Sequence, residues 1–246
     1  MEARAVNNSH YGGLGARWYR ASDDPVALLR AEATLRNPWI AEELGRTFGP
    51  RPASVLDVGC GAGFLANDLA ARGHRVTGVD TVPECLAVAA EHDATGTVAY
   101  QRGDALALPV GDASFDAVCA MDFLEHVEEP GRVIAEAARA IVPGGLFFFH
   151  TFDRSLLAWL VVIKGVEWFV KNTPPRMHVL RYFIRPGELL AMCRRQGLEP
   201  GEVRGVRPRL DRAFLDLLCT RSVPPAFRFV FDRSTRMGYS GYARKR

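Results

Sequence analysis

Between residues 52 and 151, short runs of continuously apolar residues alternate with segments whose apolar residues recur at helical spacing. The expected strands are Ser54–Val58, Arg75–Val79, Val98–Arg102, Phe115–Met121 and Leu146–Thr151. The expected helices between them are Phe64–Arg72, Pro83–His92 and Glu129–Ile141. Strands that are apolar along their whole length and separated by helices are typical of a parallel sheet covered on both faces. The pattern therefore predicts an α/β fold.

The segments that flank this core have a different pattern. Residues 1–50 predict a mostly helical lead-in, residues 152–186 interrupt the alternation, and residues 187–246 resume it. The expected elements are helices at Pro25–Arg36, Pro38–Phe48 and Pro186–Gln196, the last stopped by Gly197, and strands near Glu202–Val206 and Arg236–Ala243. Because no stretch of linker composition divides the chain, we expect one domain over residues 1–246.

Composition and charge narrow the class of protein. The 48% of hydrophobic and 24% of charged residues are ordinary for a globular protein, and a net charge of +3 predicts no nucleic-acid partner. Five cysteines without a CxxC pair argue against a disulfide framework or a structural zinc site. The start of the chain is polar from Asn7 to His10, where a signal peptide would be apolar. We therefore expect a cytoplasmic protein.

A glycine-rich turn follows the first strand of the core. Gly59, Gly61 and Gly63 lie between this strand and a helix. Glycines permit a tight turn and leave room for a ligand, and the helix directs its free N–H groups towards the turn. This pattern alone is not specific, because nicotinamide and flavin folds use a similar turn.

Acidic residues at three strand ends make the pattern more specific. Asp57 precedes the glycines, Asp80 ends the second strand, and Asp104 follows the third. These carboxylates suit a ligand with an amine, a ribose and an adenine. A dinucleotide would place its pyrophosphate on the turn, where Asp57 would repel it.

Residues 52–151 resemble the class I S-adenosylmethionine-dependent methyltransferases in the motifs VLDVGCGAGFL, VTGVD, GDA, FDAVCAMDFLEHV and PGGLFFF. The resemblance implies a Rossmann-like, seven-stranded, mostly parallel sheet with an antiparallel last strand, and a helical insertion after the fifth strand. It also implies that S-adenosylmethionine is held by Asp57, Gly59, Gly61, Asp80, Thr81, Asp104, Ala105 and, near the sulfonium, Met121.

Residues outside this core resemble the ubiquinone-biosynthesis O-methyltransferases, which act on polyprenyl catechols and phenols. The matching segments are Trp18-Tyr19, Arg36-Asn37-Pro38, Glu125-His126-Val127, 151–154, His178 and 183–186. The resemblance implies methyl transfer to a phenolic or catechol oxygen of a small, prenylated quinone precursor, with Arg36 near the cofactor. The chain departs from the family at Val179-Leu180, where the family has Asp-Trp, and at Asp153, where it has Asn.

Transfer to a phenol requires that the phenol lose its proton, because its pKa is near 10. A bound metal ion could lower the pKa of the phenol. Asp122, Glu125 and His126 are spaced i, i+3 and i+4, so one helical turn would place them on one side. The resembling family has an acid-x-x-Glu-His arrangement proposed to hold magnesium. Histidine is, however, an unusual magnesium ligand, and the segment could instead only shape the loop over the cofactor. The alternative to a metal is a general base, with His126 the first candidate, followed by His150 and His178.

Residues 155–171 predict an amphipathic helix in the insertion. Trp159, Ile163, Val166 and Val170 share one stripe, opposite to polar residues. The apolar run is too short to span a bilayer, but it could lie at a membrane surface, with Arg176, Arg181 and Arg185 meeting lipid headgroups. The alternative is an ordinary lid that packs over the substrate pocket.

Other functions are compatible with parts of this pattern. One is O- or C-methylation of another secondary metabolite, and another is a non-catalytic module that only binds the cofactor. A nicotinamide-dependent oxidoreductase is disfavoured by Asp57 and by the lack of a Tyr-x-x-x-Lys motif. RNA or protein methylation is disfavoured because no Asn-Pro-Pro-Tyr motif follows the fourth strand.

Overall fold

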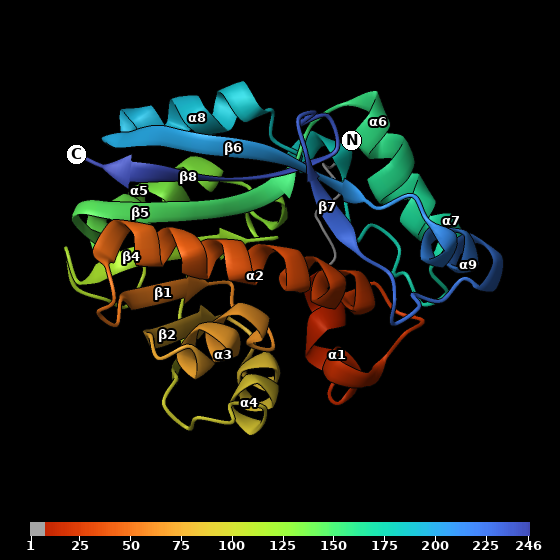
Figure 1. Ribbon diagram of the computed structural model, residues 1–246, viewed down its shortest axis with the longest axis horizontal. Coiled ribbons are helices and arrows are strands. Elements are labelled where there is room, and N and C mark those ends of the chain that lie inside the picture. Colours follow the sequence, from red (N-terminus) through yellow and green to blue (C-terminus); the bar gives the residue numbers. More distant parts are fainter. Residues whose placement is uncertain (1–7) are drawn as a thin grey trace.

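The computed structural model describes residues 8–246 and is built around one eight-stranded sheet (Figure 1). The strand order is β3-β2-β1-β4-β5-β8-β6-β7. The strands are β1 Ser54–Val58, β2 Arg75–Asp80, β3 Ala99–Arg102, β4 Phe115–Met121, β5 Ile141–Phe152, β6 Leu198–Pro208, β7 Phe229–Asp232 and β8 Gly238–Lys245. The first five strands are parallel to one another, and β8 is antiparallel to both β5 and β6. The Rossmann-like fold expected from the sequence is confirmed.

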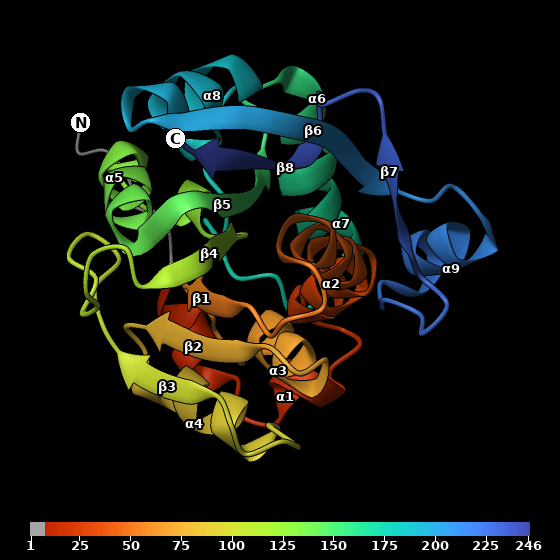
Figure 2. The same cartoon turned by 60° about the vertical axis from the view of Figure 1, so that its left-hand side comes forward.

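Helices cover both faces of the sheet (Figure 2). The α-helices are α1 Arg17–Arg20, α2 Val26–Phe48, α3 Phe64–Ala71, α4 Pro83–Glu91, α5 Pro130–Ala140, α6 Leu156–Ala158, α7 Val166–Phe169, α8 Pro186–Arg195 and α9 Arg212–Thr220. Shorter helical turns are η1 Asn8–Gly13, η2 Leu124–His126, the π-helical η3 Trp159–Gly165 and η4 Leu180–Tyr182. The first seven residues of the predicted lead-in lie outside the described residues.

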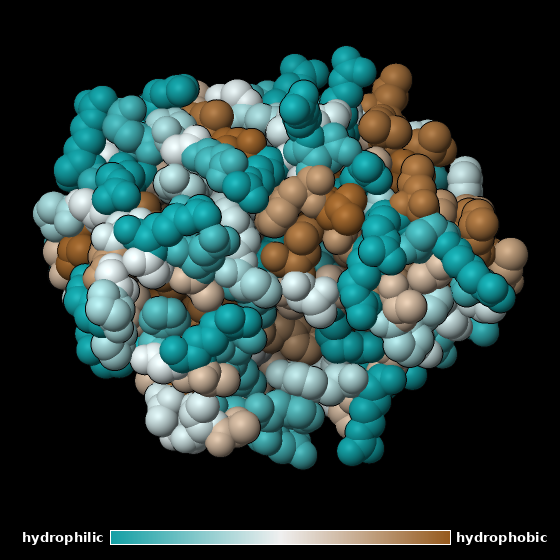
Figure 3. Space-filling model, viewed as in Figure 1, coloured by the Kyte–Doolittle hydropathy of each residue, from teal (hydrophilic) through white to brown (hydrophobic). Residues whose placement is uncertain are grey.

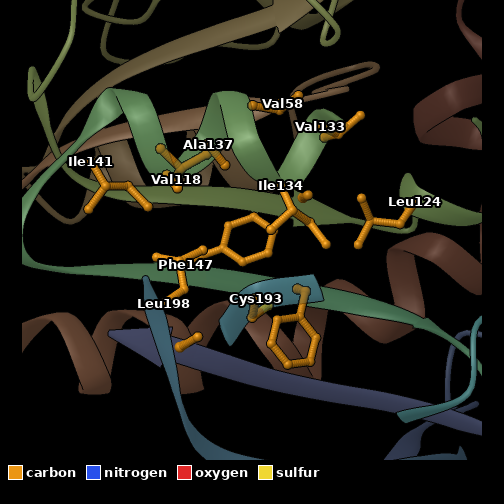
Figure 4. Packing of buried hydrophobic residues seen from close by; sticks show 14 of the residues in the cluster. Val58, Val118, Leu124, Val133, Ile134, Ala137, Ile141, Phe147, Cys193 and Leu198 are labelled. Atoms are coloured by element: carbon orange, nitrogen blue, oxygen red, sulfur yellow. The ribbon is translucent and has the colours of Figure 1, made fainter. Parts of the chain in front are cut away.

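Two apolar layers hold the helices to the sheet. On one face, Ile40 and Leu44 of α2 and Leu69 of α3 pack against β1, β4 and β5. On the other face, Ile134 of α5 and Cys193 of α8 pack against the same strands, as Figure 4 shows. Burial of apolar side chains on both faces explains why these strands are apolar at consecutive positions.

The chain order creates a topological switch at β1 and β4. From β1 the chain proceeds outward to β2 and β3, and it then returns to place β4 on the other side of β1. In open α/β sheets, ligands bind at such a switch, beyond the carboxyl ends of the strands. Asp57 and Met121 lie at the carboxyl ends of β1 and β4.

Two predictions about elements were wrong, and one helix was missed. The sheet has eight strands rather than seven, because Phe229–Asp232 adds β7 at the edge, antiparallel to β6. The two helices expected at 25–36 and 38–48 form the single helix α2, with Pro38 inside it. The sequence interpretation also missed α9. The burial of α2 along the sheet compensates for the backbone hydrogen bond that Pro38 cannot donate.

The insertion after β5 buries part of the predicted apolar stripe and leaves another part exposed. Ile163 and Val170 of the predicted stripe are buried, as expected of a lid. Trp159 of the same stripe is exposed and belongs to an apolar patch, visible as brown atoms over α6 and α7 at the upper right of Figure 3. The patch consists of Leu156, Leu157, Trp159, Leu160 and Trp168. Within residues 8–246, no helix combines the length and the hydropathy needed to cross a membrane.

Candidate functional site

The glycine-rich turn connects β1 to α3 at the switch. Gly59, Gly61 and Gly63 have φ values of +69°, +51° and +79°, which favour glycine. The N–H groups of Gly59 and Cys60 donate to the carbonyl of Val79 at 2.8 and 3.1 Å, so that the turn is fixed to β2. A Cβ on Gly59 would lie 2.2 Å from the ring of Phe123. Gly59 therefore has no room for a side chain.

Two of the predicted acids lie at this turn. The Asp80 carboxylate accepts from the N–H groups of Gly61 and Val82, both at 2.9 Å. Asp57 is 3% exposed, and its burial, reinforced by the negative charge of Asp80, raises its pKa to about 7. A buried carboxylate in this state is stabilised by a cationic partner. The residues therefore fit a ligand that brings an ammonium group to Asp57.

The affinity for S-adenosylmethionine is expected to fall as the pH drops below about 7. In the free protein, Asp57 is protonated below this pH, and the proton must leave before the carboxylate can pair with the ammonium group. The Kd is expected to be about five- to tenfold higher at pH 6.0 than at pH 7.5. Isothermal titration calorimetry at the two pH values measures this ratio. Asp57→Asn should bind weakly at both, and an equally steep pH dependence in this variant would show that another group titrates.

A cavity of about 150 Å³ lies above the turn, and we call it the cofactor cavity. The predicted cofactor residues that line it are Arg36, Asp57, Gly59, Gly61, Asp80, Thr81 and Met121. Asp122 and His126 line it as well. Asp104 and Ala105 follow β3 and do not line the cavity, and Asp104 is exposed and accepts from the N–H of Leu106. The role of these two residues remains a prediction.

Aromatic side chains reduce the size of the cofactor cavity. Trp18 lies over Gly61, and Phe123 lies over Gly59. Tyr11 stacks on Trp18 at 5.6 Å between ring centroids. A cavity of about 150 Å³ holds a ligand of about the size of benzene. The rings of Trp18 and Phe123 therefore narrow the space directly above the glycine-rich turn.

Sequence reasoning assigned no role to several residues of this cavity. Tyr11, Leu29, Asn37 and Phe123 line it, and Asn37 donates to the carbonyl of Phe64 at 2.8 Å. Asn37 belongs to the segment Arg36-Asn37-Pro38, which resembles the ubiquinone-biosynthesis O-methyltransferases. Tyr11 and Leu29 carried no local signal, because only the packing of the lead-in over the switch brings them here.

A buried ion pair joins α2 to the end of β4. Arg36 donates to the two carboxylate oxygens of Asp122 at 2.8 and 2.5 Å, and both side chains are about nine-tenths buried or more. Burial alone would raise the pKa of Asp122, but the charge of Arg36 lowers it to about 2. Arg36 also lies 3.5 Å from Glu32. The pair fixes the position of α2 over the cofactor cavity.

Two of the three predicted magnesium ligands, Glu125 and His126, lie together, but Asp122 does not join them. Among the described residues, the ligand atoms of Glu125, His126 and His178 form one group within 4.8 Å, whereas Asp122 groups with Glu32 and His150. Both oxygens of Asp122 are engaged by Arg36. One carboxylate and two imidazoles do not fit magnesium, which prefers oxygen ligands in an octahedral arrangement. The prediction of a magnesium site is therefore not supported.

The group around His126 lies against the cofactor cavity. The ring centroids of His126 and His178 are 5.5 Å apart, and burial lowers their pKa values to about 4 and about 3. Both imidazoles are therefore neutral at pH 7. Glu125 accepts from the hydroxyl of Thr151 at 2.8 Å, and burial raises its pKa to about 8. Neutral imidazoles can accept a proton from a bound hydroxyl group.

His150, the second candidate base, is part of the structural core. It is fully buried at the end of β5, and its Nδ1 is 2.8 Å from the hydroxyl oxygen of Ser240. Its Nε2 lies 3.4 Å from Asp122. It does not line the cofactor cavity or the apolar cavity described next.

A second cavity of about 410 Å³ lies beside the first, and we call it the apolar cavity. Its walls come from α2, the insertion, β6, α9 and the segment around β7. Glu32 and His178 are the titratable side chains among the described residues that line it. Leu29 lines both cavities. The arrangement suits a ligand with a polar head near His178 and an apolar remainder.

Comparison with known proteins agrees with this geometry. Residues 56–149 match the family model described as a methyltransferase domain. The chain is 36% identical over 202 residues to the ubiquinone biosynthesis O-methyltransferase of Bordetella bronchiseptica, covering 80% of this chain and 81% of that protein. It is 35% identical over 209 residues to the enzyme of the same name from Aromatoleum aromaticum, covering 84% and 87%.

Solved structures share the fold at low sequence identity. Magnesium protoporphyrin IX methyltransferase from Synechocystis PCC 6803, solved with bound SAH, is similar with a TM-score of 0.65, 17% identity and 97% of each chain covered. The [4+2]-cyclase SpnF is similar with a TM-score of 0.55 and 22% identity, covering 84% of this chain and 80% of that one. Because the same fold carries different reactions, the fold alone does not identify the chemistry.

Proposed function

This chain belongs to the ubiquinone biosynthesis O-methyltransferase family of S-adenosylmethionine-dependent methyltransferases, and we propose that it methylates a phenolic or catechol oxygen of a small, prenylated quinone precursor. The observation that carries the proposal is the junction of the two cavities. The cofactor cavity and the apolar cavity share Leu29, and His126 of the first lies beside His178 of the second.

The residues at the switch would hold the cofactor. Asp57 would pair with its ammonium group, Asp80 would accept from the ribose hydroxyls, and Met121 would lie near its sulfonium. When bound, the cofactor supplies a methyl group on a positively charged sulfur, which keeps the electron pair of the broken bond as the phenolic oxygen forms its bond to the methyl carbon. Positioning two reactants in line can supply up to ~7–11 kcal/mol of the barrier.

His126 would act as the general base. A neutral imidazole at the wall of the cofactor cavity can take the phenol proton as the methyl group is transferred. The positive charge lost from the sulfur is then replaced by a positive charge on the imidazole, so that the net charge of the buried site is unchanged. The carboxylate of Asp122 attracts the proton on His126. The proton can afterwards pass to solvent when the product leaves.

A catechol with a short prenyl chain is expected to be methylated by labelled S-adenosylmethionine, both with and without EDTA. The expectation follows from the general-base route, because the carboxylate of Asp122 is engaged by Arg36 rather than free for a metal. The measurement is label transfer to the extracted product. Loss of turnover in EDTA that is restored by magnesium would overturn the metal-free route. Cofactor binding without transfer to any catechol would direct the search to other phenolic metabolites, in line with the family departures at Val179-Leu180.

We also propose that the exposed apolar patch contacts a membrane surface, where a prenylated substrate resides. Tryptophan and leucine side chains can enter the boundary between headgroups and acyl chains. Arg176, Arg181 and Arg185 follow the patch in sequence and are exposed, so they could meet anionic headgroups.

The protein is expected to co-float with anionic liposomes at low salt, and Leu156→Glu is expected to reduce the bound fraction severalfold. Leu156 is 80% exposed in the patch, so a charge there opposes insertion without disturbing the core. The matched control is Ala94→Glu, which adds the same charge in an exposed turn after α4 and should float like the wild type. If the wild-type protein did not float with the liposomes, the proposal of membrane contact would be overturned.

A further inference from the structure

The apolar cavity has one polar end. Glu32 and His178 carry its titratable groups, and the side chains of the remaining lining residues are apolar or aromatic. His178 lies beside His126, and Leu29 also borders the cofactor cavity. A substrate whose reacting oxygen lies at His126 therefore directs the rest of its length into the apolar cavity.

The size of the apolar cavity limits what it can hold. A cavity of about 150 Å³ accommodates the six carbons of benzene, which corresponds to roughly 25 Å³ per carbon. The 410 Å³ of this cavity then accommodates roughly 16 carbons, or about three isoprene units. A longer tail cannot be enclosed.

The residues that line the apolar cavity differ in exposure from one wall to another. Leu217 and Phe227 are buried and pack with Val170 between α9, β7 and the insertion. Leu160 and Trp168 are the lining residues, among those described, that are themselves exposed, at 47% and 54%. Both belong to the exposed apolar patch. The exposed apolar patch therefore borders the apolar cavity.

We propose that the apolar cavity encloses the first isoprene units of the substrate tail, up to about three, and that the remainder of a longer tail leaves between Leu160 and Trp168. In this arrangement α9 forms part of the tail-binding wall, and Leu218, which lines the cavity and is half-buried, determines the preference for a tail. This inference rests on the proposed function, because it assigns the tail of the same substrate.

The test measures kcat/KM for catechols that carry no tail, one, three or five isoprene units. For the wild-type protein, kcat/KM is expected to rise by at least about tenfold up to three units and to change by less than about twofold beyond them. Leu218→Trp adds six side-chain atoms, or roughly 150 Å³ at the same scale, to a cavity of about 410 Å³, so it is expected to lower kcat/KM for the three-unit substrate relative to that for the tailless catechol by at least about tenfold. Turnover of the tailless catechol also shows that the variant is folded.

The matched control is Leu215→Trp on the same helix. Leu215 is 60% exposed and does not line the cavity, so this variant should match the wild type for every substrate. Equal kcat/KM for all tail lengths in the wild type would overturn the inference but not the proposed function, whereas no transfer to any catechol would overturn the proposed function itself. Tail-independent turnover together with loss of liposome flotation in Leu218→Trp would identify a lipid acyl chain as the occupant instead.

Discussion

His126→Ala is expected to lower kcat by roughly 10²- to 10⁴-fold, the usual contribution of a general base. His126 lines the cofactor cavity, lies 5.5 Å from His178 between ring centroids, and is neutral at pH 7 because burial lowers its pKa to about 4. Among the described residues, His126 is the histidine that lines the cofactor cavity, so the substitution removes the imidazole that would take the phenol proton. Steady-state turnover of the prenylated catechol measures the effect.

Two further measurements separate a base from a packing role for His126. Added imidazole is expected to restore part of the activity of His126→Ala, more so at a pH where imidazole is unprotonated, because it can enter the space left by the side chain. His74→Ala is the control, since His74 precedes β2 at the amino ends of the strands, whereas the site lies beyond their carboxyl ends, and it should leave kcat unchanged. Turnover of His126→Ala within a few-fold of the wild type would eliminate His126 as the base.

Asp122→Ala is expected to lower the free energy of unfolding by about 3–5 kcal/mol. The substitution leaves the guanidinium of Arg36 buried, with Glu32 at 3.5 Å as its remaining acidic neighbour. It also places alanine at φ +52°, a left-handed conformation that aspartate tolerates better. Thermal unfolding should show a decrease in Tm of roughly 6–20 °C for a chain of this length.

A surface pair on the same helix provides the control for Asp122. Glu42 and Arg46 form an ion pair on α2 in which both side chains are more than half exposed. Glu42→Ala should change the free energy of unfolding by no more than about 1 kcal/mol, because water already solvates this pair. If Asp122→Ala melted within a degree or two of Glu42→Ala, the Arg36–Asp122 pair would not be a structural link between α2 and β4.

The sequence interpretation grouped Asp122, Glu125 and His126 by assuming one helical turn. In the structure, Asp122 has a left-handed φ and precedes the single 3-10 turn Leu124–His126. The three side chains therefore do not share a helix face. The spacing i, i+3 and i+4 indicates proximity only where the backbone is continuously helical. An arginine 86 positions away in the sequence then takes the carboxylate that the metal interpretation required.

The regular core was predictable because its signals are local. Strands β1 and β4 have the predicted bounds. The other strands of the core differ from their predicted bounds by a few residues at their ends; β5, for example, begins at Ile141 rather than at Leu146. The element β7 was missed because Phe229–Asp232 is only four residues long and is stabilised by its pairing with β6. The helix α9 was missed although Asp211 caps it, accepting from the N–H of Phe214 at 3.2 Å.

The sequence by itself determined the fold, the glycine turn and the acids at its strand ends, because each depends on residues that are neighbours in the chain. Gly59, Asp57 and Asp80 need only two adjacent parallel strands to come together. The tertiary structure decided the partners of Arg36, the proximity of His126 to His178 and the apolar cavity. These features join segments separated by tens to nearly two hundred residues, and their contacts arise from burial of whole helix faces, which no local pattern encodes.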